Sequence, residues 1–374
     1  MSNSQTRILH LIKSLGRGGA EKLIPETAGL HDKDKYAFYC LYFHHRPNSL
    51  IDELEGVGVK VNYLPSSNFG FPWLINKVAD YVKNHQIDII HCHLPWAGVL
   101  GRCVGRMTGV KVVYTEHNMW ERYHPLSRWL NKRTFGWQQG VIAVSEEVRG
   151  SVLRHYKPIL KSPLIKTIPN AVNTGKFQKD LGGRDRVRNR FGIPYDAPVI
   201  GQVAVFRTQK RLDRWIAVAK EIAQIHRDVH FILVGDGPER ELVEKSIGRG
   251  AFASKVHLSG AQEKVVPYLS AMDVYMMTSE FEGLPVGMLE AMSCELPVLS
   301  TRVGGIGEVI NDGVEGMLCP KDYTEKLAFA ASALLTDRLR RQEMGKMARK
   351  RAASQFSLKR MVSALEEFYM EVQN

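Results

Sequence analysis

Short apolar segments alternate with longer amphipathic segments along most of the chain, which is the pattern of strands alternating with helices. Strand candidates in the first half are mostly β-branched and bounded by Gly, Pro, Asn or charged residues. They are Arg7–Ile12, Ala37–Phe43, Val59–Leu64, Ile87–Cys92, Val110–Thr115, Gly140–Val144 and Ile165–Ile168. Helices are expected from Ala20 onward and over Trp73–His85. This order predicts a parallel sheet with helices on both faces.

The alternation pauses between Pro169 and Pro198 in a polar, glycine-containing stretch that we interpret as a connection with a short helix inside it. It then resumes with strands at Val199–Val205, His230–Val234, Val256–Ser259, Val274–Thr278 and Pro297–Ser300. A chain of 374 residues suits two domains, which we place at 1–175 and 195–356. Helical spacing of apolar residues over 357–374 predicts a terminal helix whose apolar side must dock on a domain.

The predicted fold class is therefore α/β, with two Rossmann-like, doubly wound parallel sheets. In such sheets the carboxyl ends of the strands and the N-termini of the helices share one side, where anions bind. We accordingly expect the ligand site in a central cleft that the two domains face.

Composition narrows the class of protein without identifying it. The chain is 44% hydrophobic and 24% charged, and no apolar run approaches the 18 residues of a membrane span. The N-terminal residues lack a secretory signal pattern, and the five cysteines form no CxxC pair, so we expect a reducing, cytoplasmic location. The net charge is +12, and residues 1–175 hold 22 basic against 13 acidic residues, which suits an anionic partner.

The most informative stretch is residues 278–310, TSEFEGLPVGMLEAMSCELPVLSTRVGGIGEVI. A strand ends near Thr278, and a helix is expected to begin near Val286, so the backbone N–H groups from Gly283 onward would form an anion site. Glu282 precedes this helix and Glu290 lies on it, which places Glu282 beside a reacting sugar and Glu290 beside a diol such as ribose. Gly304, Gly305 and Gly307 form a second loop whose backbone can approach phosphate.

The EGLP, LEA and GGIGEVI segments resemble the retaining GT-B glycosyltransferases of family 4, and the resemblance covers nearly the whole chain. It implies that Glu282 contacts the donor sugar and that Glu290 binds the ribose. It also implies that the terminal helix, 357–374, crosses back to the first domain. Gly283, Leu284 and Pro285 would complete the loop around the sugar and phosphate.

Two further segments of the second half are candidates for the donor site. VAVFRTQKRLD, residues 203–213, carries Lys210 and Arg207, whose charges can stabilise a leaving diphosphate. Lys210 matches the lysine of similar enzymes, whereas the usual arginine position reads Val205 and Arg207 is displaced by two residues. In LVGDGPER, residues 233–240, Gly235 is the residue expected to approach the donor.

In the first half, SLGRGGAEK (14–22) reads GxGG and does not match the dinucleotide fingerprint, which argues against NAD chemistry. By resemblance this loop lies under the donor phosphate and the acceptor, with Gly19 as the best match, and His117 in YTEHNMW corresponds to a histidine that contacts the donor sugar. In VSEEV, Ser145 is interpreted as a helix N-cap rather than a nucleophile.

No metal or other cofactor is expected. His91 and His93 flank Cys92, but alternation along a strand sends neighbours to opposite faces, and no DxD motif ends a strand. Helix dipoles and Lys210 would carry the diphosphate charge instead.

Residues 119–137 mix aromatic and basic side chains, among them Trp129, Trp137, Arg128 and Arg133. The mixture suits contact with the inner face of a membrane or with a lipid-linked diphosphate, and equally a helix packed on the sheet with a solvated basic face.

The resemblance implies transfer of a hexose-type sugar from a nucleotide-diphosphate donor, UDP-sugar favoured over GDP-sugar, to a glycan or polyprenyl-linked acceptor in surface polysaccharide synthesis, with no nucleic-acid partner. Two alternatives stay open: a nucleotide-sugar epimerase of the same fold, and a non-catalytic binding protein for sugar nucleotides.

Overall fold

The chain folds into two compact α/β units in a computed structural model that describes residues 5–46, 48–66, 71–157, 163–323 and 325–374. Unit 1 comprises residues 1–170 and 358–374, and unit 2 comprises residues 171–357. The connection expected between the two sheets thus belongs to unit 2, and the terminal helix belongs to unit 1.

Unit 1 is built on a seven-stranded parallel sheet with the order β3-β2-β1-β4-β5-β6-β7. Its strands are β1 (Thr6–Ser14), β2 (Tyr36–His44), β3 (Lys60–Tyr63), β4 (Ile89–His93), β5 (Lys111–Glu116), β6 (Gly140–Ala143) and β7 (Leu164–Thr167). All seven were predicted within a few residues, because β-branched runs between turn residues are a strong strand signal.

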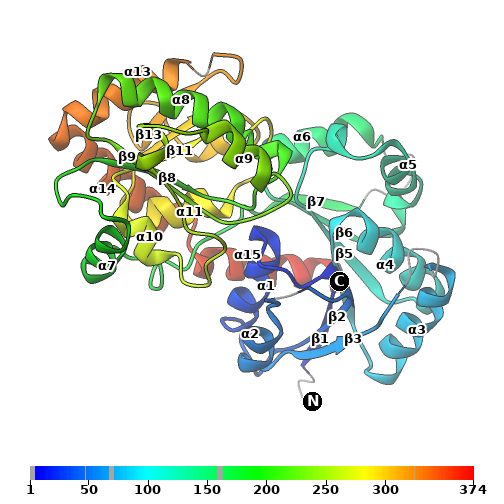
Figure 1. Cartoon of the computed structure of the whole chain (residues 1–374). Helices are drawn as coiled ribbons and strands as arrows, with labels where there is room; N and C mark the ends of the chain where they lie inside the picture. The colour runs from blue at the N-terminus through cyan, green and yellow to red at the C-terminus, as the bar shows by residue number, and fades with distance from the viewer. Residues whose placement is uncertain (1–4, 47, 67–70, 158–162, 324) are drawn as a thin grey trace. The chain divides into compact units, whose positions relative to one another are not determined.

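Helices cover both faces of this sheet (Figure 1). They are α1 (Gly19–Ala28), α2 (Ile51–Gly56), α3 (Phe71–Asn84), α4 (Leu94–Thr108), α5 (Pro125–Thr134), α6 (Glu146–His155) and α15 (Leu358–Gln373), with 3-10 turns at Trp120–Arg122 and Phe135–Trp137. α3, α4 and α6 pack on one face and α1, α2 and α15 on the other. Ser145 caps α6 as predicted, since its hydroxyl accepts a hydrogen bond from the Val148 N–H at 3.2 Å.

Unit 2 contains a six-stranded parallel sheet with the order β10-β9-β8-β11-β12-β13. Its strands are β8 (Val199–Val203), β9 (His230–Val234), β10 (Val256–Leu258), β11 (Val274–Met277), β12 (Val298–Thr301) and β13 (Gly316–Cys319). Sequence reasoning did not predict β13. This four-residue strand lies at the edge of the sheet, and its sequence has no clear strand pattern.

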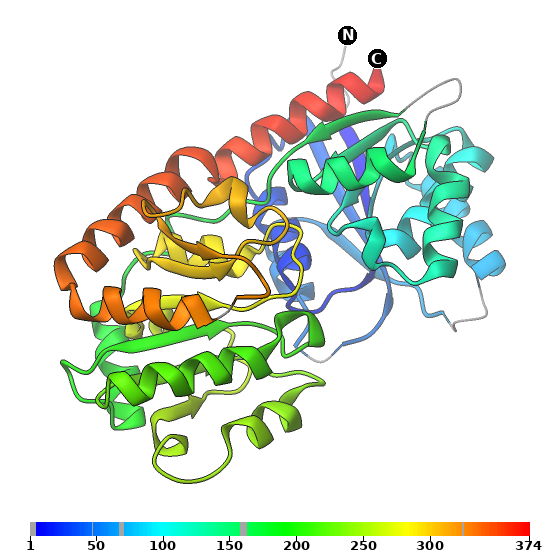
Figure 2. The same cartoon turned by 90° about the horizontal axis from the view of Figure 1, so that it is seen from above.

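The helices of unit 2 are α7 (Leu181–Phe191), α8 (Leu212–Ile225), α9 (Arg240–Ile247), α10 (Val266–Ala271), α11 (Val286–Ser293), α12 (Ile306–Val309), α13 (Glu325–Thr336) and α14 (Arg338–Gln355), with 3-10 turns at Thr208–Lys210 and Ala253–Lys255. α8 and α13 lie side by side on the sheet (Figure 2), and with α9 they bury one of its faces. Two parallel, helix-covered sheets of this kind confirm the predicted fold class, GT-B.

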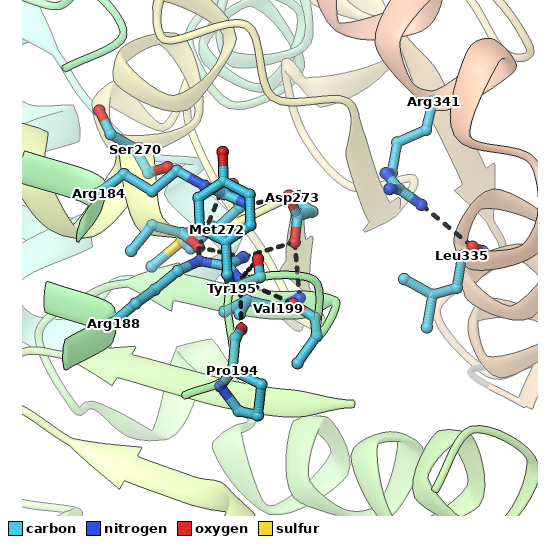
Figure 3. A network of polar contacts seen from close by, with 12 residues as sticks. Arg184, Arg188, Pro194, Tyr195, Val199, Ser270, Met272, Asp273, Leu335 and Arg341 are labelled. Carbon is cyan, nitrogen blue, oxygen red and sulfur yellow. Dashed lines mark hydrogen bonds and ion pairs between the residues drawn. The ribbon is translucent and has the colours of Figure 1, made fainter. Parts of the chain in front are cut away.

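A buried arginine anchors α7 to the sheet of unit 2 (Figure 3). The Arg188 guanidinium donates to the carbonyl oxygens of Pro194, Tyr195, Ala197 and Ala271 at 2.8 to 3.2 Å, and to Oδ2 of Asp273 at 2.9 Å. Asp273 also accepts a hydrogen bond from the Val199 N–H at 2.9 Å, where β8 begins. Asp273 also pairs with Arg184 at 3.1 Å, so two ion pairs fix the connecting segment to the first strand of unit 2.

Candidate functional site

The loop after β11 holds Glu282 in a buried, fixed position. Only 4% of Glu282 is exposed, and its Oε1 accepts hydrogen bonds from the Ser279 hydroxyl at 2.7 Å and from Lys210 Nζ at 2.6 Å. Ser279 is held in turn because Thr301 Oγ1, at the end of β12, donates to its carbonyl at 2.7 Å. The carboxylate is thus held at one oxygen by a neutral donor and by a cation.

Lys210 reaches this loop from the 3-10 turn that follows β8. Its side chain is 17% exposed and forms an ion pair with Glu282, whose side chain is 6% exposed. An ammonium group has three N–H donors, and Glu282 occupies one. The structure therefore brings together Lys210 and Glu282, two residues that the sequence placed 72 positions apart.

Glu290 lies on α11 and is 3% exposed. Burial raises the pKa of the Tyr275 phenol, and the charges of Glu290 and Glu282 raise it further, so both carboxylates lie within electrostatic range of this one residue of β11. The Tyr275 hydroxyl donates to the Val203 carbonyl at 3.0 Å, which ties β11 to the end of β8. The two glutamates thus flank a single strand end.

Glycines bring the loops around Glu282 into close contact. Gly304 has φ +52°, and a Cβ on it would lie 1.8 Å from the Glu282 carbonyl oxygen. The neighbouring Gly305 N–H donates to the Gly283 carbonyl at 2.7 Å. Because no side chain fits at position 304, the loop after β12 directly supports the loop that carries Glu282.

Gly235 has a similar structural reason to be glycine. Its φ is +139°, and a Cβ would lie 1.8 Å from the Ala204 carbonyl oxygen, so the loops after β8 and β9 touch there. Contact with the donor, the role expected for Gly235, stays a prediction.

The remaining predicted donor residues of unit 2 differ in exposure. Leu284 is 4% exposed, and Pro285 is the N-cap residue of α11, which begins at Val286 as predicted. Arg207 is exposed, and its side chain makes no ion pair within the described part of the chain. Of the two predicted cations, only Lys210 is fixed beside a carboxylate.

In unit 1, His117 lies directly after β5 and lines a cavity of about 20 Å³, enough for one water molecule. The cavity also contacts Ala20 and Leu23 of α1, so it lies next to the first turn of the helix that begins at Gly19. Burial lowers the pKa of His117 to about 4, so the ring is neutral at pH 7.

Three more histidines line the same cavity: His10 of β1, and His91 and His93 of β4. Alternation along β4 puts Cys92 on the opposite face, as the sequence predicted, in the core with α3 and α4. One ring nitrogen from each of the three lies within 4.8 Å of the others, so the set could ligate a metal ion. The absence of a metal requirement stays a prediction.

Glu116, the residue before His117, points to the opposite face and is fully buried. Burial raises its pKa to about 7, opposed by hydrogen bonds from Tyr123, the Asn118 N–H, Trp120 Nε1 and Tyr114. Trp120 and Tyr123 belong to residues 119–137, for which membrane contact and packing on the sheet were both open, and these two side chains are held by a buried carboxyl group.

Other large side chains of that segment are exposed, although Asn131, Thr134 and Phe135 are buried. On α5, Leu126 is 59% and Trp129 is 54% exposed, and Trp137 after it is 38% exposed. The Arg133 guanidinium lies over the Trp129 ring at 5.5 Å, and that of Arg106 lies over Trp137 at 4.9 Å. Among the helices of the described residues, none has the length and apolar character needed to cross a bilayer.

Two helix-covered parallel sheets, with a glutamate before and on the helix that follows a strand end, are the arrangement expected from the resemblance to GT-B glycosyltransferases. Residues 17–176 match the model of glycosyltransferase family 4, and residues 183–351 match that of the glycosyl transferases group 1. The chain is 30% identical over 308 residues to N-acetyl-alpha-D-glucosaminyl L-malate synthase of Bacillus anthracis, covering 80% of this chain and 78% of that one. The protein therefore belongs to the group 1, family 4 glycosyltransferases, as the resemblance implied.

Other relatives agree with this assignment. Alpha-maltose-1-phosphate synthase of Mycolicibacterium smegmatis is 26% identical to this chain, and the match spans 76% of this chain and 79% of the synthase. The solved structure of Anabaena HepE in complex with UDP-glucose superimposes with a TM-score of 0.87 at 21% identity, covering 98% of this chain and 99% of HepE. Family membership decides for a glycosyltransferase over the epimerase and the non-catalytic binding protein.

Sequence reasoning missed the residues that support the site. Ser279 lies in the motif three residues before Glu282, and Tyr275 lies on the predicted strand before the motif, but neither residue carried a distinguishing signal. His10 was recognisable only as an isolated histidine in an apolar strand, and His93 only as a neighbour of His91, because the relation of both to His117 depends on strand order.

Proposed function

We propose that this glycosyltransferase retains the anomeric configuration and uses a nucleotide-diphosphate sugar as its donor, with UDP-sugar favoured over GDP-sugar. The observation that carries the proposal is the buried Lys210–Glu282 pair at 2.6 Å, with Glu290 on the next helix. HepE of Anabaena, whose fold this chain shares, was solved with UDP-glucose, which supports the choice of base.

In the proposed reaction the bond between the sugar C1 and the diphosphate oxygen breaks, and a bond from C1 to the acceptor oxygen forms on the same face. The acceptor proton passes to a diphosphate oxygen, so no protein group changes its protonation state overall. Lys210 would stabilise the negative charge that develops on the diphosphate. Glu282 and His117 would orient the sugar, and Glu290 would accept hydrogen bonds from the ribose hydroxyls.

The donor side of the proposal is tested by nucleoside-diphosphate release from UDP-, GDP- and ADP-sugars. Glu282→Gln and Lys210→Met should each lower kcat/KM by about 100-fold or more, the typical effect of removing one electrostatic contact to a transition state. Glu244→Gln is the matched control, since this glutamate lies exposed on α9 in a surface pair with Arg240. Full activity of both site variants would refute the site.

The stereochemical outcome needs its own measurement. The anomeric coupling constant of the product, measured by proton NMR before mutarotation, should match that of the donor. A product of inverted configuration would refute the retaining mechanism while leaving the donor assignment intact.

We further propose that the acceptor is a glycan or a polyprenyl-linked sugar, reached at the inner face of the membrane. The exposed aromatic and cationic side chains of α5 favour an anionic lipid surface, because Trp rings insert at headgroup depth while Arg and Lys pair with phosphates. Vesicles containing anionic phospholipid should bind the protein, and phosphatidylcholine vesicles should not. Trp129→Ser together with Arg133→Ser should abolish this binding, and equal binding of wild type and variant would refute it.

A further inference from the structure

Four histidines of unit 1, namely His10, His91, His93 and His117, form one buried cluster on a single face of the sheet. Alternation along each strand produces it, because positions 10, 91, 93, 115 and 117 all point to the side covered by α1 and α15. His10 and His91 are register partners across β1 and β4. Neither the donor chemistry nor the family motifs account for His10 and His93.

Within the cluster, His93 links His117 to the protein interior. His93 Nδ1 lies 3.4 Å from His117 Nε2, and His93 Nε2 lies 3.0 Å from His10 Nδ1. The His117 Nδ1 atom makes no hydrogen bond to any residue that the structure describes. Of the two ring nitrogens of His117, one is therefore bonded to His93 and the other is left for a ligand.

The remaining histidine fixes the orientation of the His93 ring. His91 is held by Tyr369 Oη at 2.7 Å from Nδ1 and by Thr115 Oγ1 at 2.6 Å from Nε2. Its ring packs against that of His93 with centroids 4.5 Å apart and planes inclined by 27°. His93 thus has a stacking partner on one side and hydrogen-bonding partners at both nitrogens.

Neutral imidazoles joined in this way determine each other's tautomers. A neutral ring has one N–H donor and one acceptor nitrogen, so His93 cannot donate at both nitrogens or accept at both. Burial lowers the pKa of all four histidines, which keeps the rings neutral at pH 7. Whichever nitrogen of His93 carries the proton, His117 must take the complementary tautomer.

We propose that His93 is a positioning residue for the transfer reaction: through its hydrogen bond it holds His117 in one ring orientation and one tautomer, so that Nδ1 of His117 presents a defined donor or acceptor to the sugar. The proposal rests on the proposed function, in which His117 contacts the donor sugar. A metal ion on His10, His91 and His93 is the competing interpretation, and it would require the His10–His93 hydrogen bond to break and His91 to release Thr115 or Tyr369.

Three variants of the full-length protein separate hydrogen bonding from packing. His93→Phe keeps an aromatic ring but removes both hydrogen bonds, and it should lower kcat by about tenfold or more, since misplacing an orienting group by about 1 Å can cost up to about 100-fold. His93→Asn places an amide near the former Nδ1 and should restore most of the activity. The KM for the donor should stay within about threefold in both, because binding is not the function assigned to His93. His85→Ala, at a histidine that directly follows α3 and lies outside the cluster, is the control.

The decisive readout is the tautomer itself, from 15N NMR of ring-labelled histidine. His117 should show one neutral tautomer in the wild type and in His93→Asn, and a mixture in His93→Phe. An unchanged His117 signal in His93→Phe would overturn the proposal, as would one equivalent of zinc or another transition metal in the purified protein. If His117→Ala retains full turnover, the proposed role of His117 in the reaction fails instead, whatever the NMR result.

Discussion

Replacing Gly304 by alanine should damage the site through the backbone of the loop that carries Glu282. An alanine Cβ would lie 1.8 Å from the Glu282 carbonyl oxygen, whereas real Cβ contacts are essentially never closer than 3.0 Å. One of the two loops must therefore move by about an ångström. Such overpacking costs about 1–3 kcal/mol of unfolding free energy. The residue must also keep φ +52°, which costs a side-chain-bearing residue about 1–2 kcal/mol more.

Gly192→Ala is the matched control, because it isolates the backbone cost. Gly192, the C-cap residue of α7, has φ +62°, and a Cβ there would meet nothing within 4 Å. Gly304→Ala should therefore be less stable than Gly192→Ala by about 1–3 kcal/mol, which is the overpacking cost alone. For a unit of this size that difference lowers Tm by roughly 2–4 °C for each kcal/mol.

Calorimetry and steady-state kinetics together test this reasoning. The shift of Glu282 should lower kcat/KM of Gly304→Ala by about 100-fold, the effect of a 1 Å misplacement, while Gly192→Ala keeps wild-type activity. Equal stability and equal activity of the two variants would show that the loops after β11 and β12 are not in the close contact described.

Three further outcomes concern stability. Arg188→Met should cost about 3–5 kcal/mol in urea unfolding, because the carbonyls of Pro194, Tyr195 and Ala197 lose a buried donor and Asp273 keeps only Arg184 as an ion-pair partner; Arg186→Met on the same helix should cost less than about 1 kcal/mol. Burial lowers the pKa values of His10 and His117 to about 3 and about 4, so the unfolded chain binds more protons than the folded chain below pH 6.5. The free energy of unfolding should therefore decrease as pH falls from 6.5 to 4, and an unfolding free energy that does not change with pH would contradict this. The pKa of Glu116 rises to about 7, so the folded chain binds more protons at this residue than the unfolded chain does. Glu116 should therefore lower the free energy of unfolding by about 3 kcal/mol as pH rises from 4.5 to 7. Stability of Glu116→Gln should therefore rise more steeply with pH in that window than wild-type stability, and parallel curves would exclude the shift.

The glycosyltransferase class was predictable because its signals are local. Strand and helix periodicity depends on neighbouring residues, and so do the turn glycines and the segment from Glu282 to Glu290, which is continuous in sequence and forms one loop and one helix. β13 escaped prediction because a short edge strand carries too few alternating positions to be distinguished from a turn.

The amino-acid sequence by itself determined two parallel α/β sheets, the start of α11 at Val286 and the carboxylates that precede and follow it. Only the tertiary structure decided which distant residues meet there: Lys210 with Glu282, Gly304 against the Glu282 backbone, and His93 between His10 and His117. The physical reason is that parallel strands adjacent in the sheet are separated in the chain by whole helices. Strand order and register decide which strand ends lie next to each other at the carboxyl edge of a sheet, and a local sequence pattern contains no information on either.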